Sequence, residues 1–133
     1  MLAIRLFLGF SALVWLPYGI FCFLQPGYLT EAAGLGLTSA TATTEVRAMY
    51  GGLQMAIGAL SGMALLRPTL VQSALTALAF LTVGLGTARL IGSLLDSSYS
   101  TYTVGALIFE FLSAGLAIWL LRRSGSVVHA PAH

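Results

Sequence analysis

Two charged side chains lie well inside long apolar stretches of the sequence, where a charge is costly. Arg89 belongs to the stretch that ends at Leu95, and Glu110 belongs to the stretch that begins near Tyr102. A charge at the centre of a bilayer costs at least about 2.5–3.5 kcal/mol, so such side chains usually face other helices and pair with one another. Each lies about eight residues, or about 12 Å of helix, from the connection between the two stretches. We therefore predict an ion pair between Arg89 and Glu110, or its water-bridged equivalent.

A second set of polar residues opens the preceding apolar stretch. Arg47, Tyr50 and Gln54 are spaced i, i+3 and i+7, which predicts that they share one face of an α-helix. Glu45 lies on a different face of that helix, and Gln54 reaches about the depth of Arg89. The two sets together form one candidate polar cluster in the outer half of the membrane, made of Glu45, Arg47, Tyr50, Gln54, Arg89 and Glu110.

This cluster has two interpretations. Its members can satisfy one another and fix the register of the helices, a role that buried ionic groups have in some proteins. Alternatively, they form a binding or reaction site, the default hypothesis for ionisable residues inside a membrane. In that hypothesis Arg47 and Arg89 contact a polar or anionic group of a ligand, and Glu110 balances Arg89 and can carry a proton. Tyr50 and Gln54 orient the ligand by hydrogen bonds.

The composition requires helices that span a membrane to carry these residues. Of the 133 residues, 58% are hydrophobic and 8% are charged, against about 25% charged in a soluble domain. This excludes a soluble globular protein and a disordered one. Because a span needs about 20 apolar residues, we predict an all-α, four-helix transmembrane bundle that forms one domain over residues 1–123. The predicted spans are residues 6–24, 44–66, 69–95 and 102–121, and a disordered tail follows over 124–133.

Local signals predict where these spans begin and end. Residues 36–43 are rich in Gly, Ser, Thr and Ala and predict a loop, with Thr43 or Thr44 as the N-cap of the second span. Arg67 ends that span, because a residue that precedes a proline, here Pro68, avoids the α conformation. The connection is so short that spans two and three should be antiparallel neighbours.

The placement of charge predicts orientation and partners. The four arginines at one end of the predicted bundle are Arg5, Arg67, Arg122 and Arg123, and the other end carries Glu31 and Asp96. The positive-inside rule then places both termini in the cytoplasm. No basic stripe supports nucleic-acid binding, and no histidine lies in a span, so we expect no metal and no cofactor. The expected partners are membrane lipid, a small amphipathic ligand and a second copy or a larger membrane complex. Steps such as Gly58–Gly62 favour close helix packing, either within one chain or between two copies.

The start of the second span resembles a known family. Residues 44–54, TEVRAMYGGLQ, resemble the signature of a family of small bacterial membrane proteins, domain of unknown function number 4345. The positions that match are Leu35-Gly36, Glu45, Arg47, Tyr50, Gly51, Gly52, Arg89 and Glu110. The resemblance covers nearly the whole chain. It implies four spans in a bacterial inner membrane and the same polar cluster, and it implies no activity.

Three classes of function fit these observations. The first is a binding or accessory protein that holds a small or amphipathic ligand, a lipid or a partner helix at the polar cluster. The second is a small proton-coupled transporter with Glu110 as the coupling carboxylate. Small multidrug transporters have a similar size, but their acid lies in the first span, which here has none. The third is a membrane-embedded isomerase or cyclase for an apolar substrate, with Glu110 as acid or base and Tyr50 as hydrogen-bond donor.

Overall fold

The computed structural model describes residues 1–125, which form a bundle of helices. The elements in chain order are α1 (Leu2–Leu24), α2 (Tyr28–Ala33), α3 (Ala40–Val46), η1 (Arg47–Gly52), α4 (Leu53–Leu66), η2 (Pro68–Leu70), α5 (Val71–Leu95) and α6 (Thr101–Gly125). Four stretches are long and apolar enough to cross a membrane, namely Leu2–Leu24, Ala40–Leu66, Pro68–Leu95 and Thr101–Ser124. The chain is therefore a multi-pass membrane protein with the predicted all-helical, four-span architecture.

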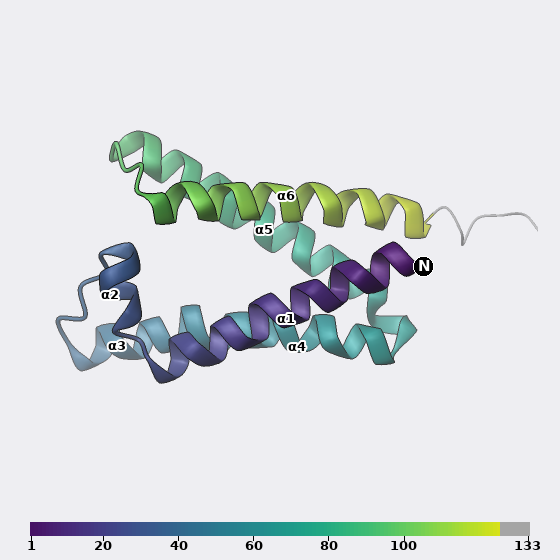
Figure 1. Ribbon diagram of the computed structural model, residues 1–133, viewed down its shortest axis with the longest axis horizontal. Coiled ribbons are helices and arrows are strands. Elements are labelled where there is room, and N and C mark those ends of the chain that lie inside the picture. Colours follow the sequence, from purple (N-terminus) through teal and green to yellow (C-terminus); the bar gives the residue numbers. More distant parts are fainter. Residues whose placement is uncertain (126–133) are drawn as a thin grey trace, which may run out of the picture.

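The bundle consists of two antiparallel helix pairs (Figure 1). Helix α1 packs along α4, and α5 packs along α6, whereas the two pairs have much less contact with each other. The pairs converge at the end that carries the N-terminus and the connection from α4 to α5, which we call the termini end. They diverge at the opposite end, which carries α2 and the connection from α5 to α6 and which we call the loop end.

Glycines of η1 and α4 bring the second span into very close contact with α1. A Cβ atom added to Gly58 would lie 2.4 Å from the backbone nitrogen of Leu16, and one added to Gly51 would lie 2.8 Å from the Cβ atom of Phe23. Small residues permit such an approach between membrane helices, where no hydrophobic force draws the helices together. The packing predicted for Gly58 thus occurs within one chain.

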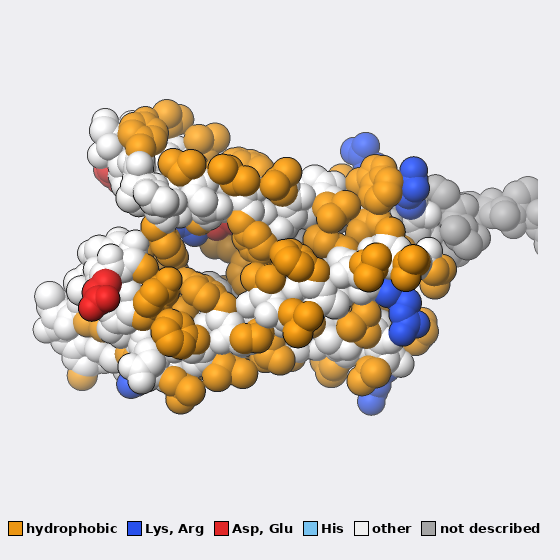
Figure 2. Space-filling model, in the orientation of Figure 1, with side chains coloured by type: hydrophobic (Ala, Val, Ile, Leu, Met, Phe, Trp, Pro, Cys, Tyr) orange, Lys and Arg blue, Asp and Glu red, His pale blue; other side chains and the backbone are white. Residues whose placement is uncertain are grey.

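The hydrophobic core lies towards the termini end. Leu8 of α1, Leu75 and Leu78 of α5 and Leu120 of α6 are almost fully buried there. Figure 2 shows hydrophobic side chains over much of the visible face, with basic side chains gathered mainly at the termini end. The same view shows a hollow between the two helix pairs towards the loop end. The pairs are therefore packed against each other most closely at the termini end.

The second span begins earlier than the sequence predicts. Ser39 is the N-cap, with an extended backbone (φ −149, ψ 163), and its side chain accepts a hydrogen bond from the Ala42 N–H. The predicted caps are wrong because Thr43 already lies inside α3, where its hydroxyl donates to the Ser39 carbonyl at 3.2 Å. A serine accepts from the first turn readily, so residues 40–43 are helix and not loop.

The structure confirms the predicted end of the second span and places the end of the fourth span later than predicted. Arg67 has the extended backbone (φ −126, ψ 97) expected before Pro68, which confirms that the second span ends there. Helix α6 continues to Gly125, so the predicted tail does not begin at residue 124. Most of that tail, residues 126–133, lies outside the residues that the structure describes.

The contact between α1 and α4 generates a test on two glycines of one helix. We expect Gly58→Ala to lower the free energy of unfolding by about 1–3 kcal/mol, because the new methyl group overlaps backbone atoms of α1. Gly62→Ala is the matched control, since its Cβ would meet only the Ala12 Cβ at 3.8 Å. Thermal unfolding of both variants in the same detergent micelles measures the difference, and equal unfolding temperatures would contradict the glycine contact.

Candidate functional site

Arg89 and Glu110 form a direct ion pair between α5 and α6. The Nε of Arg89 donates to both carboxylate oxygens of Glu110, at 3.1 and 3.0 Å, and Nη2 donates to Oε1 at 2.8 Å. The Glu110 side chain is 5% exposed and that of Arg89 is 23% exposed. The pairing predicted from the depth of the two residues is thus found as a direct contact. Its location inside a bilayer stays a prediction.

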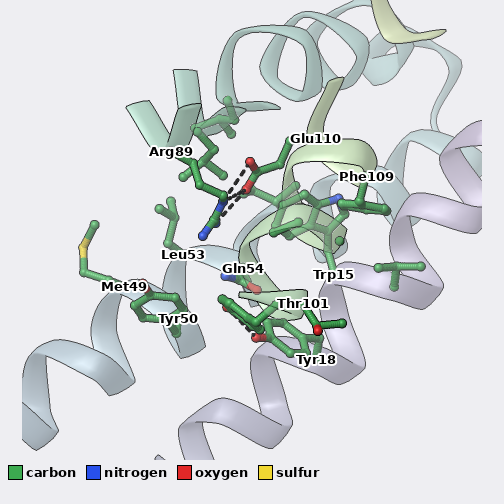
Figure 3. A pocket seen from close by; sticks show the side chains of 17 residues that line it. Trp15, Tyr18, Met49, Tyr50, Leu53, Gln54, Arg89, Thr101, Phe109 and Glu110 are labelled. Atoms are coloured by element: carbon green, nitrogen blue, oxygen red, sulfur yellow. Dashed lines mark hydrogen bonds and ion pairs between the residues drawn. The ribbon is translucent and has the colours of Figure 1, made fainter. Parts of the chain in front are cut away.

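The ion pair borders a cavity of about 520 Å³ that lies between the two helix pairs. All four long helical stretches contribute to its wall. The aromatic and polar residues around it include Trp15 and Tyr18 of α1, Tyr50 and Gln54 of the second span, and Tyr102 and Phe109 of α6. Figure 3 labels five of these side chains near the ion pair, namely Trp15, Tyr18, Tyr50, Gln54 and Phe109. Most of the remaining lining residues are aliphatic. The cavity is therefore an apolar space with a few polar groups along its wall.

Gln54 has an unmet hydrogen bond beside this cavity. Its side-chain oxygen is buried and has no hydrogen-bond partner among residues 1–125. A buried polar atom without a partner costs about 1–3 kcal/mol, and most such atoms in proteins are paired. The amide thus offers an acceptor at the wall of the cavity that the rest of the described chain does not use.

Aromatic residues link α1 to α6 across one side of the cavity. The hydroxyl groups of Tyr18 and Tyr102 are 3.4 Å apart, and the ring centroids of Trp15 and Phe109 are 5.7 Å apart. The Arg89 guanidinium lies 5.8 Å from the centre of the Tyr102 ring. The predicted cluster contains none of these aromatic residues. Their signal in the sequence is spacing, since Trp15 and Tyr18 are three residues apart and share a helix face.

Two residues of the predicted cluster lie outside the cavity wall. Glu45 is exposed. Arg47 is also exposed, and its Nε donates to the carbonyl oxygen of Phe23 at 3.1 Å. Phe23 lies in the last turn of α1, where carbonyl oxygens have no partner inside the helix. Arg47 therefore satisfies a carbonyl group at the end of α1, and it is not part of the cavity wall that contains Arg89.

The sequence predicts that Arg47 shares a helix face with Tyr50 and Gln54, but it does not, because a π-helical turn lies at this point of the second span. In η1 the helix widens, and the N–H of Leu53 donates to the carbonyl of Ala48, five residues earlier. The i, i+3, i+7 rule assumes α-helical spacing, and a π turn holds more residues. Tyr50 and Gln54 line the cavity, whereas Arg47 is turned to the end of α1.

A second, smaller hollow of about 220 Å³ meets Arg89 from the loop end. The polar residues that line it include Ser93, Asp96, Ser98 and Thr103. Arg89 thus lines both this hollow and the larger cavity.

The chain matches the model of a known protein family. A family model described as Domain of unknown function (DUF4345) matches residues 3–121. No curated protein and no solved structure matches. The matched range contains all of the residues that line the cavity.

The ion pair generates a stability test with a built-in control. We expect Arg89→Leu to lower the free energy of unfolding by about 3–5 kcal/mol, because it leaves the buried Glu110 carboxylate without its partner. The double variant Arg89→Leu/Glu110→Leu should recover most of that loss, since it removes both charges. Denaturant titrations in one detergent compare the variants. A double variant less stable than Arg89→Leu would contradict this account of the pair.

Proposed function

The chain belongs to the family of the domain of unknown function DUF4345, and from that premise we propose that it binds a lipid-like amphipathic molecule in the cavity between its two helix pairs. The polar end of this molecule meets Arg89, Glu110, Gln54 and the tyrosine hydroxyls. Its apolar part lies among the aliphatic and aromatic side chains of the wall.

One observation carries this proposal: an ion pair borders a large cavity instead of being enclosed by side chains. Protein interiors are packed about as densely as organic crystals. A pair that served only to fix α5 against α6 would need no open space beside it. The cavity of about 520 Å³ falls within the range of about 300–1,000 Å³ that is typical of small-molecule sites.

The composition of the wall supports the same class of ligand. Ligand sites are mostly apolar and carry a small number of polar groups that fix orientation. Here Leu81, Leu85 and Arg89 follow one another at intervals of four residues along α5 and all line the cavity. The wall of α5 therefore changes from aliphatic to charged over about 12 Å in the direction of the loop end.

We propose also that the cavity opens towards the outside of a bacterial inner membrane. The termini end carries Arg5, Arg67, Arg122 and Arg123, and the positive-inside rule assigns such an end to the cytoplasm. The resemblance to small bacterial membrane proteins supports the choice of membrane.

Two glycines of α6 test ligand binding. Gly105 lines the cavity and Gly115 does not, yet a Cβ atom added to either would have no other atom within 4 Å. We expect Gly105→Leu to fill part of the cavity and remove bound molecules, whereas Gly115→Leu should retain them. Native mass spectrometry of each protein, released from nanodiscs made with its own membrane lipids, measures the mass retained beyond that of the polypeptide.

A discrete added mass on the wild type and on Gly115→Leu, reduced at least about tenfold on Gly105→Leu, is the expected result. Identical adducts on all three proteins, or no adduct on any of them, would contradict binding in this cavity. Because both variants introduce leucine into the same helix, a general effect of the substitution on folding or release would change both.

Orientation is tested with single cysteines. In a Cys22→Ala background, which removes the chain's one cysteine, Thr41→Cys marks the loop end and Thr69→Cys marks the termini end. Both positions are exposed. We expect a membrane-impermeant maleimide to label Thr41→Cys in intact bacterial cells, and to label Thr69→Cys only after the cells are permeabilised. The opposite pattern would invert the proposed orientation.

A further inference from the structure

We infer that the polar end of the bound molecule is uncharged and carries a hydroxyl group, as in a long-chain alcohol or a monoacylglycerol. This inference rests on the proposed function and adds the chemical class of the ligand. Three features of the cavity support it: its charge balance, the hydrogen-bonding groups of its wall that have no partner, and the position of its apolar wall.

The charge balance of the cavity favours an uncharged ligand. Arg89 and Glu110 carry the charges of its described wall, and each already faces the other at 2.8 Å. A negatively charged group would enter beside a guanidinium that is already neutralised, and a positively charged group would compete for a carboxylate that Arg89 holds through three contacts. Either would add one uncompensated charge to an apolar space, which is strongly unfavourable.

The Arg89 guanidinium leaves hydrogen-bond donors open. Arginine has five N–H groups, and Glu110 receives hydrogen bonds only from Nε and Nη2. Both N–H groups of Nη1 are without a hydrogen-bonding partner in the described part of the chain. A molecule in the cavity can therefore satisfy them with an oxygen that accepts.

Gln54, in contrast to Arg89, needs a hydrogen-bond donor. Its side-chain oxygen is an acceptor that is buried and has no partner among the described residues. Rotation about the last torsion of the side chain, which is a soft one, would exchange the amide oxygen and nitrogen and turn this oxygen towards the cavity. Figure 3 shows the Gln54 amide reaching the part of the cavity that faces the Arg89 guanidinium. A hydroxyl group both donates and accepts. One hydroxyl can thus meet the open donors of Arg89 and the open acceptor of Gln54.

The apolar part of the cavity wall indicates where the hydrocarbon chain of such a molecule would lie. Leu85 and Leu81 extend from Arg89 towards the termini end, and Trp15 and Ile57 face the same cavity from the other helix pair. The hydroxyl end would therefore lie at Arg89 and the hydrocarbon chain would point towards the core. Trp15 is 6% exposed, so it reports on the contents of the cavity from a protected position.

Fluorescence quenching by brominated probes tests the inference. The chain has two tryptophans, and Trp119→Phe leaves Trp15 as the one reporter. Dibromostearyl alcohol, dibromostearyl sulfate and dibromostearyl trimethylammonium have the same quenching chain and differ in their permanent head-group charge. We expect the alcohol to quench Trp15 with a half-saturating concentration about tenfold or more below those of the two charged probes.

The hydroxyl proton is tested separately. Dibromostearyl methyl ether keeps the acceptor oxygen and lacks the donor. We expect it to bind about tenfold more weakly than the alcohol to the Trp119→Phe protein, and we expect this difference to disappear in Trp119→Phe/Gln54→Leu. If the alcohol and the ether bind equally to the protein that retains Gln54, the assigned role of the hydroxyl is overturned.

The outcomes separate this inference from the proposed function. If no probe quenches Trp15 more strongly than it does in Trp119→Phe/Gly105→Leu, the cavity takes no lipid-like molecule and the proposed function fails. If the sulfate or the ammonium probe binds as tightly as the alcohol, or more tightly, the uncharged class is overturned while binding in the cavity stands.

Discussion

The ion pair between Arg89 and Glu110 is the interaction on which the rest of the arrangement depends. Two charges in an apolar bundle must be paired by the protein itself, since each is costly alone. Their contact joins α5 to α6. On the side of the termini, aliphatic side chains fill the space between the two pairs. On the other side the ion pair borders a cavity, so one interaction both joins two helices and supplies the charged groups of the cavity wall.

The segment from Arg47 to Gly52 has two roles that its sequence spacing does not separate. Its π-helical turn directs Arg47 to the carbonyl of Phe23 and brings Gly51 against the same residue. These contacts fix the second span to the end of α1. The same segment presents Met49 and Tyr50 to the cavity. A π turn inside an α-helix is frequently found at functional sites. Here it allows neighbouring residues to serve the packing and the cavity at once.

The hydropathy of the sequence and the depth of each charged residue within its span predict much of this structure. The face of the helix on which each side chain lies is harder to predict. The four spans follow from apolar length, and the Arg89–Glu110 contact follows from counting residues from a shared connection. The contact between Tyr18 and Tyr102 could not be derived in this way, because α1 and α6 are far apart in the sequence and depth alone does not give the facing side. The α-helical spacing predicts the wrong helix face for Arg47, because residues 47–52 form a π-helical turn. The sequence does not single out Ser39 as the N-cap, because the threonines that follow it are equally good caps.

The incomplete packing of the bundle has a consequence for how binding and folding are coupled. Each helix pair holds itself together, α1 with α4 through glycine contacts and α5 with α6 through the ion pair. Between the pairs, the core closes only the termini end. An occupant of the cavity would supply at the loop end the contacts that Leu75 and Leu78 supply at the other end. A molecule that binds only the folded state stabilises that state, so the proposed ligand would extend the shared core between the two pairs towards the loop end.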